Sequence, residues 1–298
     1  MSDNLRGILA ILASATGFVV NDALVKLATA ELPTGEIIFV RGVMATLILG
    51  AATSMAGAWR SPVVLLRPAM LLRIGSAALA TLCIVAALRH VPLATSTAIL
   101  QVTPLVVTAG AALLLKAPVG WRRWTASFAG FFGVLLIVQP GSESFVPEVW
   151  IALVALVFTA TRDLTTRFVD HDVPSLLVAV ASSAVIMVTG LLLYPLETWV
   201  VPSVHVMLLL AGASVCLYFA YYLGIVAMRV GEIAVVAPFR YSLILLALIL
   251  SYIIWGHVPN ALAMLGIFVV CGAGIYLLHR ERVAAREGKT VAAQARTA

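Results

Sequence analysis

Aromatic hydroxyls gather in one short stretch of the chain. Tyr218, Tyr221 and Tyr222 are spaced i, i+3 and i+4, so in a helix they share one face. Such a face can stack on a planar ligand and offer hydroxyls to its edge, although ordinary helix packing would also explain any single tyrosine. With polar residues from neighbouring segments it forms the leading candidate binding site, which comprises Tyr218, Tyr221, Tyr222, Tyr241, Arg240, Gln101, Thr103 and Ser242.

Ionisable side chains form a second group, because they interrupt long apolar runs. A charge inside a membrane span is costly, so it normally faces protein or water and has a partner. Depth along the predicted helices pairs Asp22 with Arg41, and Asp163 with Arg240. The nearby exchange partners are Lys26, Glu36, Arg162 and Glu232, although Lys26, close to a span end, is expected to snorkel to the interface. The pairs predict either structural pins or a gating and coupling role.

No sequence motif predicts catalysis, a metal site or a cofactor. The chain has no phosphate-binding loop, no nucleophile elbow and no HExxH motif. Cys83, Cys216 and Cys271 fall inside apolar runs without metal-ligand spacing. We therefore expect no enzyme, no catalytic residue and no bound metal or cofactor.

The elements that must position these residues are membrane helices. The chain is 62% hydrophobic and 11% charged, whereas a soluble domain is roughly 25% charged. A span needs about 20 apolar residues, which leaves room for about ten crossings. Hydropathy and proline positions predict an all-α membrane protein with ten transmembrane helices near 5–28, 34–57, 71–89, 93–115, 121–139, 148–168, 173–196, 204–228, 232–255 and 258–279.

The distribution of charge predicts the orientation. Alternate loops carry Arg and Lys, whereas the others carry mainly Glu, so both termini are expected in the cytoplasm of a multi-pass inner-membrane protein. All six tryptophans fall at predicted span ends, where they prefer the interface. Because the basic residues serve as membrane anchors, the net charge of +6 indicates lipids as partners and no nucleic acid.

Ten spans divide into two halves of five, and an odd number per half places the second half upside down. At an offset of about 140 residues, acidic and basic positions recur, with Asp22 over Asp163. We predict two inverted five-helix repeats, over residues 1–140 and 141–279, followed by a basic cytoplasmic tail, 280–298, expected to be disordered. Pro104 and Pro238 interrupt corresponding helices, which is typical of transporter sites.

The sequence resembles the drug/metabolite transporter superfamily, in its EamA-type branch. The resemblance rests on Asn21-Asp22-x-x-x-Lys26, Phe39-Val-Arg41-Gly, the stretch from Ala87 to Pro104, and the stretch from Ala227 to Tyr241. It implies ten helices in two repeats and a small-molecule substrate. One departure is that Lys116-Ala117 and Gly256-His257 stand where relatives often have a Gly-Glu pair.

These observations predict a secondary transporter of a small organic metabolite. The matching pattern looks most like that of riboflavin-type vitamin transporters, so a flat aromatic vitamin is the best candidate, with exporters of amino acids or drugs as close rivals. The rival from another class is a membrane-embedded enzyme acting on lipid-linked phosphates. The state of the protein, monomer or homodimer, is left open, as are the coupling ion and the direction of transport.

Overall fold

The computed structural model describes residues 3–114, 120–140, 146–169, 173–230, 236–277 and 279, which are helices and their connections. The tail 280–298, Lys116, Ala117, Glu232 and the proposed repeat boundary at Gly141 lie outside the described residues. The helices are α1 (Asp3–Ala28), α2 (Thr34–Met55), α3 (Pro68–His90), α4 (Leu93–Leu100), α5 (Thr103–Leu114), α6 (Trp121–Val138), α7 (Val149–Thr165), α8 (Ser175–Leu192), α9 (Val204–Val230), α11 (Ser242–Trp255) and a last helix, Ala261–Leu277. Short 3-10 turns are η1 (Pro62–Leu66), η2 (Thr166–Phe168), η3 (Tyr194–Leu196) and η4 (Ala237–Tyr241).

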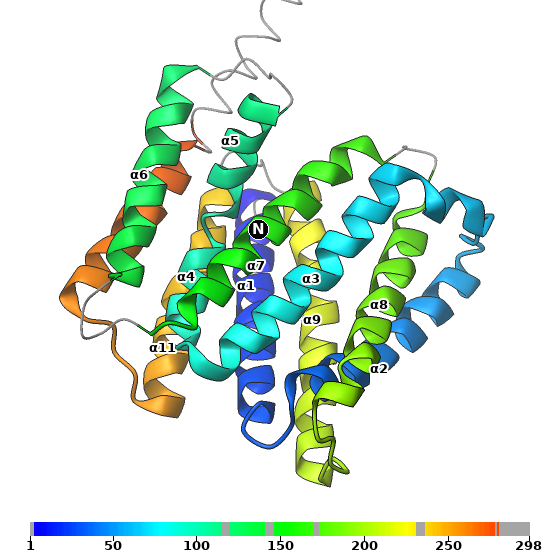
Figure 1. The fold of residues 1–298 in the computed structure, drawn as a ribbon. Coiled ribbons are helices and arrows are strands. Elements are labelled where there is room, and N and C mark those ends of the chain that lie inside the picture. The colour runs from blue at the N-terminus through cyan, green and yellow to red at the C-terminus, as the bar shows by residue number, and fades with distance from the viewer. Residues whose placement is uncertain are drawn as a thin grey trace, which may run out of the picture.

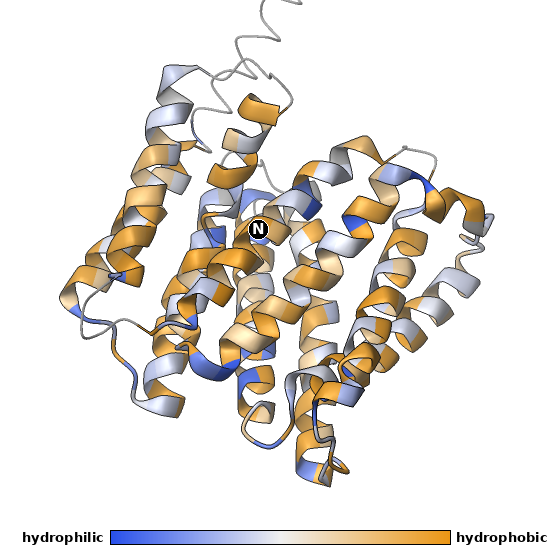
Figure 2. Cartoon of the chain, viewed as in Figure 1, coloured by the Kyte–Doolittle hydropathy of each residue, from blue (hydrophilic) through white to orange (hydrophobic). Residues whose placement is uncertain are grey.

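The lengths and apolar composition of these helices fit a membrane. Within the described ranges, seven segments are long and apolar enough to span one, and two shorter apolar helices, Trp124–Val138 and Ala261–Leu277, add to them. With α7, they occupy the ten positions predicted from hydropathy. Figure 2 shows hydrophobic residues along most of each helix, and large apolar side chains such as Leu47 and Phe268 are exposed. A surface of this kind belongs against lipid, and the predicted fold class is confirmed.

Helices of the first half pair with helices of the second. The three most extensive contacts join α1 to α9, α3 to α7, and α2 to α8. Figure 1 shows α3 and α7 lying side by side in front of α1 and α9. An inverted repeat would relate α1 to α7, α2 to α8 and α3 to α9. The same symmetry turns the α1–α9 contact into the α7–α3 contact and leaves the α2–α8 contact unchanged, so these three contacts are the ones that such a repeat requires. The exact boundary between the repeats stays a prediction.

Glycines allow α2 and α8 to approach closely. A Cβ atom on Gly190 of α8 would lie 2.5 Å from the backbone nitrogen of Phe39, and one on Gly42 of α2 would lie 2.6 Å from the Cα atom of Met187. Without water to drive helices together, membrane helices associate through such close packing. The α2–α8 pair is therefore fixed by close backbone contact.

The fourth span is interrupted in its middle, as Pro104 predicted. Helix α4 ends at Leu100 and α5 begins at Thr103. Proline has no N–H to donate to the carbonyl of Leu100, four residues earlier, and the hydroxyl of Thr103 donates to that carbonyl instead, at 2.5 Å. The corresponding span in the second half contains, in its described part, the 3-10 turn η4 with Pro238. The side chain of Gln101 joins the two irregular segments by donating to the carbonyl of Arg240 at 3.3 Å.

Candidate substrate site

Aromatic and cationic groups from several helices lie near Tyr221 on α9. Its ring meets Phe18 of α1 edge to face, with ring centroids 5.1 Å apart. The guanidinium groups of Arg41 on α2, Arg73 on α3 and Arg162 on α7 lie within electrostatic range of its hydroxyl. Five helices from both halves thus contribute to one place in the structure. We call these residues, Phe18, Arg41, Arg73, Arg162 and Tyr221, the Tyr221 cluster.

Arg41 and Asp22 are linked through an intermediate side chain. Arg41 donates to the side-chain oxygen of Asn21 at 2.8 Å, and the Asn21 amide donates to Asp22 at 2.8 Å. Asp22 and Arg41 interact electrostatically, but they form no direct salt bridge. The depth argument therefore placed the two residues together, and Asn21 is the residue that connects them.

The second predicted pair has a different arrangement. Asp163 forms its ion pair with Arg162 of the same helix, at 2.8 Å, while the backbone carbonyl of Arg240 accepts the hydrogen bond from Gln101. Arg240 itself is exposed. Arg73 donates to Thr166 and to Ser182 at 3.0 Å each. Arg162 is thus the partner of Asp163, and Arg73 ties α3 to η2 and α8.

In the structure, the three tyrosines of the predicted face do not all lie on the same side of α9. Ala220 packs against α1 and marks the side of α9 that faces it. Since successive residues are rotated by about 100° around a helix axis, Tyr221 lies about 100° from Ala220, whereas Tyr218 and Tyr222 lie about 160° from it, on the far side of α9. All three rings are about half exposed, Tyr221 at 55%. Tyr218 packs edge-on against Phe219. Of the three, Tyr221 is the one that packs against Phe18 of α1 and lies within electrostatic range of the three arginines.

Residues around the two helix interruptions serve packing. Tyr241 is 7% exposed and belongs to a hydrophobic cluster formed by α4, α6, α7, α11 and the last helix. Its ring fills the space beside Gly274, where a Cβ atom would overlap it. The hydroxyl of Thr103 and the amide of Gln101 are bound to backbone carbonyls. The Ser242 hydroxyl is buried and has no hydrogen-bond partner within the described residues.

Lys26 and Glu36 stabilise one end of the bundle. Lys26 is 9% exposed, so the expectation that it snorkels is wrong. Its ammonium donates to the carbonyls of Leu88 at 2.5 Å and Val91 at 2.8 Å, and it lies 5.6 Å from the centre of the Trp255 ring. These carbonyls end α3, where partial negative charge favours a cation.

A reciprocal pair of carboxylates joins α2 to the connection before α9. Glu36 accepts from the backbone N–H of Val200 at 3.1 Å, and Glu197 accepts from that of Gly35 at 2.8 Å. Each carboxylate satisfies a backbone donor that has no partner within its own helix or loop. We call these contacts, with those of Lys26, the end clamp.

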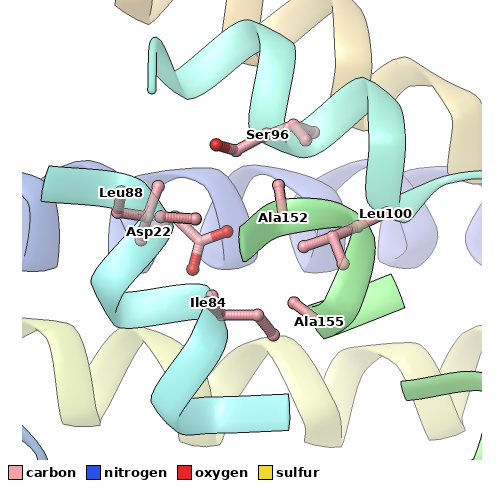
Figure 3. A pocket seen from close by; sticks show the side chains of 9 residues that line it. Asp22, Ile84, Leu88, Ser96, Leu100, Ala152 and Ala155 are labelled. Atoms are coloured by element: carbon pink, nitrogen blue, oxygen red, sulfur yellow. The ribbon is translucent and has the colours of Figure 1, made fainter. Parts of the chain in front are cut away.

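The carboxylate of Asp22 faces a small pocket (Figure 3). Ile84 and Leu88 come from α3, Ser96 and Leu100 from α4, and Ala152 and Ala155 from α7. The enclosed space holds about one water molecule. Within the described residues, no three His, Cys, Asp or Glu side chains group in a way that could hold a metal ion.

Sequence reasoning missed Phe18, Asn21 and Arg73 as members of this region. Phe18 gave no signal, because one phenylalanine in an apolar span is unremarkable in sequence. Asn21 could have been found from its position beside Asp22 in a motif, since a buried amide also needs partners. Arg73 sits near the start of α3, where a basic residue is ordinarily a membrane-side anchor and gives no signal of a site.

Comparison with known proteins identifies the family. The model of the EamA-like transporter family matches residues 5–139. The chain is 31% identical over 279 residues to the pseudopaline exporter CntI of Pseudomonas aeruginosa, covering 89% of this chain and 93% of that protein. It is 28% identical over 205 residues to a riboflavin transporter of Vibrio cholerae, covering 68% of each.

Two further similarities are more distant. An S-adenosylmethionine uptake transporter of Rickettsia prowazekii is 23% identical over 192 residues, which cover 64% of this chain and 65% of that protein. A solved structure described as "Crystal structure of protein" shares the fold, with a TM-score of 0.62 at 18% identity over 92% of this chain and 96% of that one. The ten-helix arrangement and these similarities agree, and the chain belongs to the EamA-like transporter family, whose members are multi-pass membrane transporters of small metabolites and not enzymes.

Proposed function

We propose that this chain carries a flat aromatic metabolite across the bacterial inner membrane, and that riboflavin is the first substrate to test. The observation that carries the proposal is the Tyr221 cluster, in which an aromatic pair lies within electrostatic range of three guanidinium groups. A flat ring system can pack against Tyr221 and Phe18, while its carbonyl oxygens accept hydrogen bonds from arginine. The Vibrio cholerae riboflavin transporter supports the same choice.

The site is proposed to centre on Tyr221 and Arg41, with Tyr218 and Tyr222 bordering the path on α9. Of the residues first predicted, Tyr241, Gln101 and Thr103 would act indirectly, because their side chains pack the helix interruptions. Since the cluster combines α1, α2 and α3 with α7 and α9 of one chain, we propose that a single copy is the transport unit.

Transport in this proposal requires the end clamp to open and close. Lys26, Glu36 and Glu197 hold the ends of α1, α2 and α3 against the second half at one side of the bundle. Charge placement supports the outside as that side, since Glu31 and Glu197 lie there whereas Arg60 and Arg67 lie at the opposite ends of the helices. Both termini would then be cytoplasmic.

A second candidate is export of an amino acid or an amino-acid derivative that carries carboxylates. Three arginines around one tyrosine suit carboxylate groups, which guanidinium binds with two parallel hydrogen bonds. Of the three transporters compared above by sequence, the exporter CntI aligns over the greatest length. Aromatic amino acids would satisfy both the rings and the cations.

Uptake and export can be separated in one experiment. Labelled riboflavin would be supplied to a bacterial strain that can neither make nor import it, with the chain or an empty vector expressed. Riboflavin-dependent growth and uptake in cells with the chain support the first candidate. Efflux of preloaded labelled amino acids, without riboflavin uptake, supports the second, and absence of riboflavin uptake from a correctly inserted protein overturns the first.

A further inference from the structure

We propose that Asp22 and Ser96 form a proton-binding site that couples proton movement to transport. This site lies beside the Tyr221 cluster and is separate from it, because Asp22 faces α3, α4 and α7 across the pocket of Figure 3. The binding of the proton does not depend on which metabolite is carried. Only its coupling role depends on the chain being a transporter.

The first argument is an unsatisfied hydroxyl opposite a carboxylate. Ser96 is 4% exposed, lines the same pocket as Asp22, and its Oγ atom has no hydrogen-bond partner within the described part of the chain. Buried polar groups are nearly always satisfied, so an orphaned hydroxyl aimed at a cavity indicates a missing partner. A water molecule or a proton shared with the carboxylate would supply it.

The second argument is the balance of charge around Asp22. The pocket walls contributed by α3, α4 and α7 are Ile84, Ala87, Leu88, Leu100, Ala152 and Ala155, with the hydroxyls of Ser96 and Thr97. Asn21 donates one hydrogen bond to Asp22 and connects it to Arg41. Lys26, one turn further along α1, is already held by two carbonyls.

Both protonation states of Asp22 can be accommodated in this geometry. As a carboxylate, it accepts from Asn21 and, with rotation of the hydroxyl, from Ser96, directly or through one water. As a neutral acid, it can donate its proton to a water in the pocket, which in turn donates to the Ser96 oxygen, since the Ser96 hydrogen can turn away. The proton is exchanged with water, and no other bond forms or breaks. A divalent cation such as Ca²⁺, which takes roughly six to eight oxygen ligands, fits poorly in a pocket with one carboxylate and two hydroxyls.

Arg41 provides the physical link to the substrate. It donates to Asn21, which donates to Asp22, and its guanidinium lies within electrostatic range of Tyr221. Neutralising Asp22 changes the net charge next to Arg41 by one unit. The affinity of the Tyr221 cluster for a polar or anionic ligand must then change, and by linkage ligand binding must change proton affinity equally.

The test reads the proton directly and needs no metabolite. Infrared difference spectra of the purified full-length protein would be recorded during a pH titration, with and without ¹³C-labelled aspartate. We expect an aspartic-acid C=O band that is absent in Asp22→Asn. Ser96→Ala should retain this band but change its frequency and its titration midpoint, because the acid loses its hydrogen-bond partner.

Two control substitutions make the assignment specific. Ser251→Ala also removes a buried hydroxyl with no partner within the described residues, but on α11 outside the pocket, and should leave the band unchanged. Glu31→Gln removes an exposed carboxylate and should do the same. An unaltered spectrum in Asp22→Asn or Ser96→Ala would overturn the proposal. So would Na⁺ displacing the proton at fixed pH, since the pocket would then bind a metal cation.

Discussion

Removal of the Lys26 ammonium should lower the free energy of unfolding of the bundle, and the contacts in the structure give the size of this loss. Lys26→Met keeps the length and apolar bulk of the side chain. It removes two charge-assisted hydrogen bonds, to the carbonyls of Leu88 and Val91, each worth roughly 1.5–3 kcal/mol, and a contact with Trp255 worth roughly 0.5–2 kcal/mol.

An opposing effect reduces this loss. A buried ammonium has a desolvation cost of several kcal/mol, which the methionine avoids. Hydrogen bonds between membrane helices also contribute less than expected, on average about 0.6 kcal/mol when both partners are neutral. We therefore expect a net loss of about 2 kcal/mol in the free energy of unfolding. The corresponding change in Tm is about 4–8 °C.

Equilibrium unfolding in detergent micelles, followed by tryptophan fluorescence, measures this loss. Arg60→Met is the matched control, because it also replaces a cation with methionine but at an exposed position. Combining Lys26→Met with Trp255→Leu should give less than the sum of the two effects, with a coupling of about 0.5–1 kcal/mol. If Lys26→Met were as stable as Arg60→Met to within about 0.5 kcal/mol, Lys26 would not be part of a clamp.

Other consequences can be tested separately. Gly190→Ala should lower stability and the yield of folded protein, measured by gel filtration, because the new Cβ meets the Phe39 backbone; Gly50→Ala, with open space around it, should not. In a cysteine-free background, an impermeant thiol reagent on intact spheroplasts should label Val201→Cys and spare Met55→Cys. Both positions are exposed, Val201 at 95% and Met55 at 90%, so the side of the membrane decides the labelling. The reverse pattern would contradict the proposed orientation. In proteoliposomes, Asp22→Asn should abolish riboflavin accumulation driven by a pH gradient but retain counterflow exchange. A variant that keeps both activities would contradict coupling through Asp22.

The sequence predicted the membrane fold well because span length and hydropathy are local properties. Runs of about 20 apolar residues ending in proline or charge could form little else, and the break at Pro104 follows from its missing N–H. The neighbourhood of Asp22 and Arg41 was also predictable, because counting residues at constant rise gives depth along a helix.

Side-chain partners were harder to predict. Depth does not fix rotation about the helix axis, so Asp163 and Arg240 could be assigned to each other although Asp163 pairs with Arg162. Aromatic residues give no sequence signal that separates a lipid-facing ring, a packed ring and a ligand-facing ring. Tyr241 and Tyr221 therefore looked alike, although one is buried in a hydrophobic cluster and the other lies among arginines.

The central claim is that the metabolite binds against Tyr221, and its dissociation constant is the most direct measurement. Riboflavin binding to the purified protein would be followed by quenching of flavin fluorescence. Loss of one stacking contact, worth about 0.5–1.5 kcal/mol, predicts that Tyr221→Ala raises Kd about 2- to 13-fold. Tyr252→Ala, an exposed tyrosine of α11, should bind as the wild type does. Equal Kd values for Tyr221→Ala and the wild type, or equal weakening by both substitutions, would contradict the proposed site.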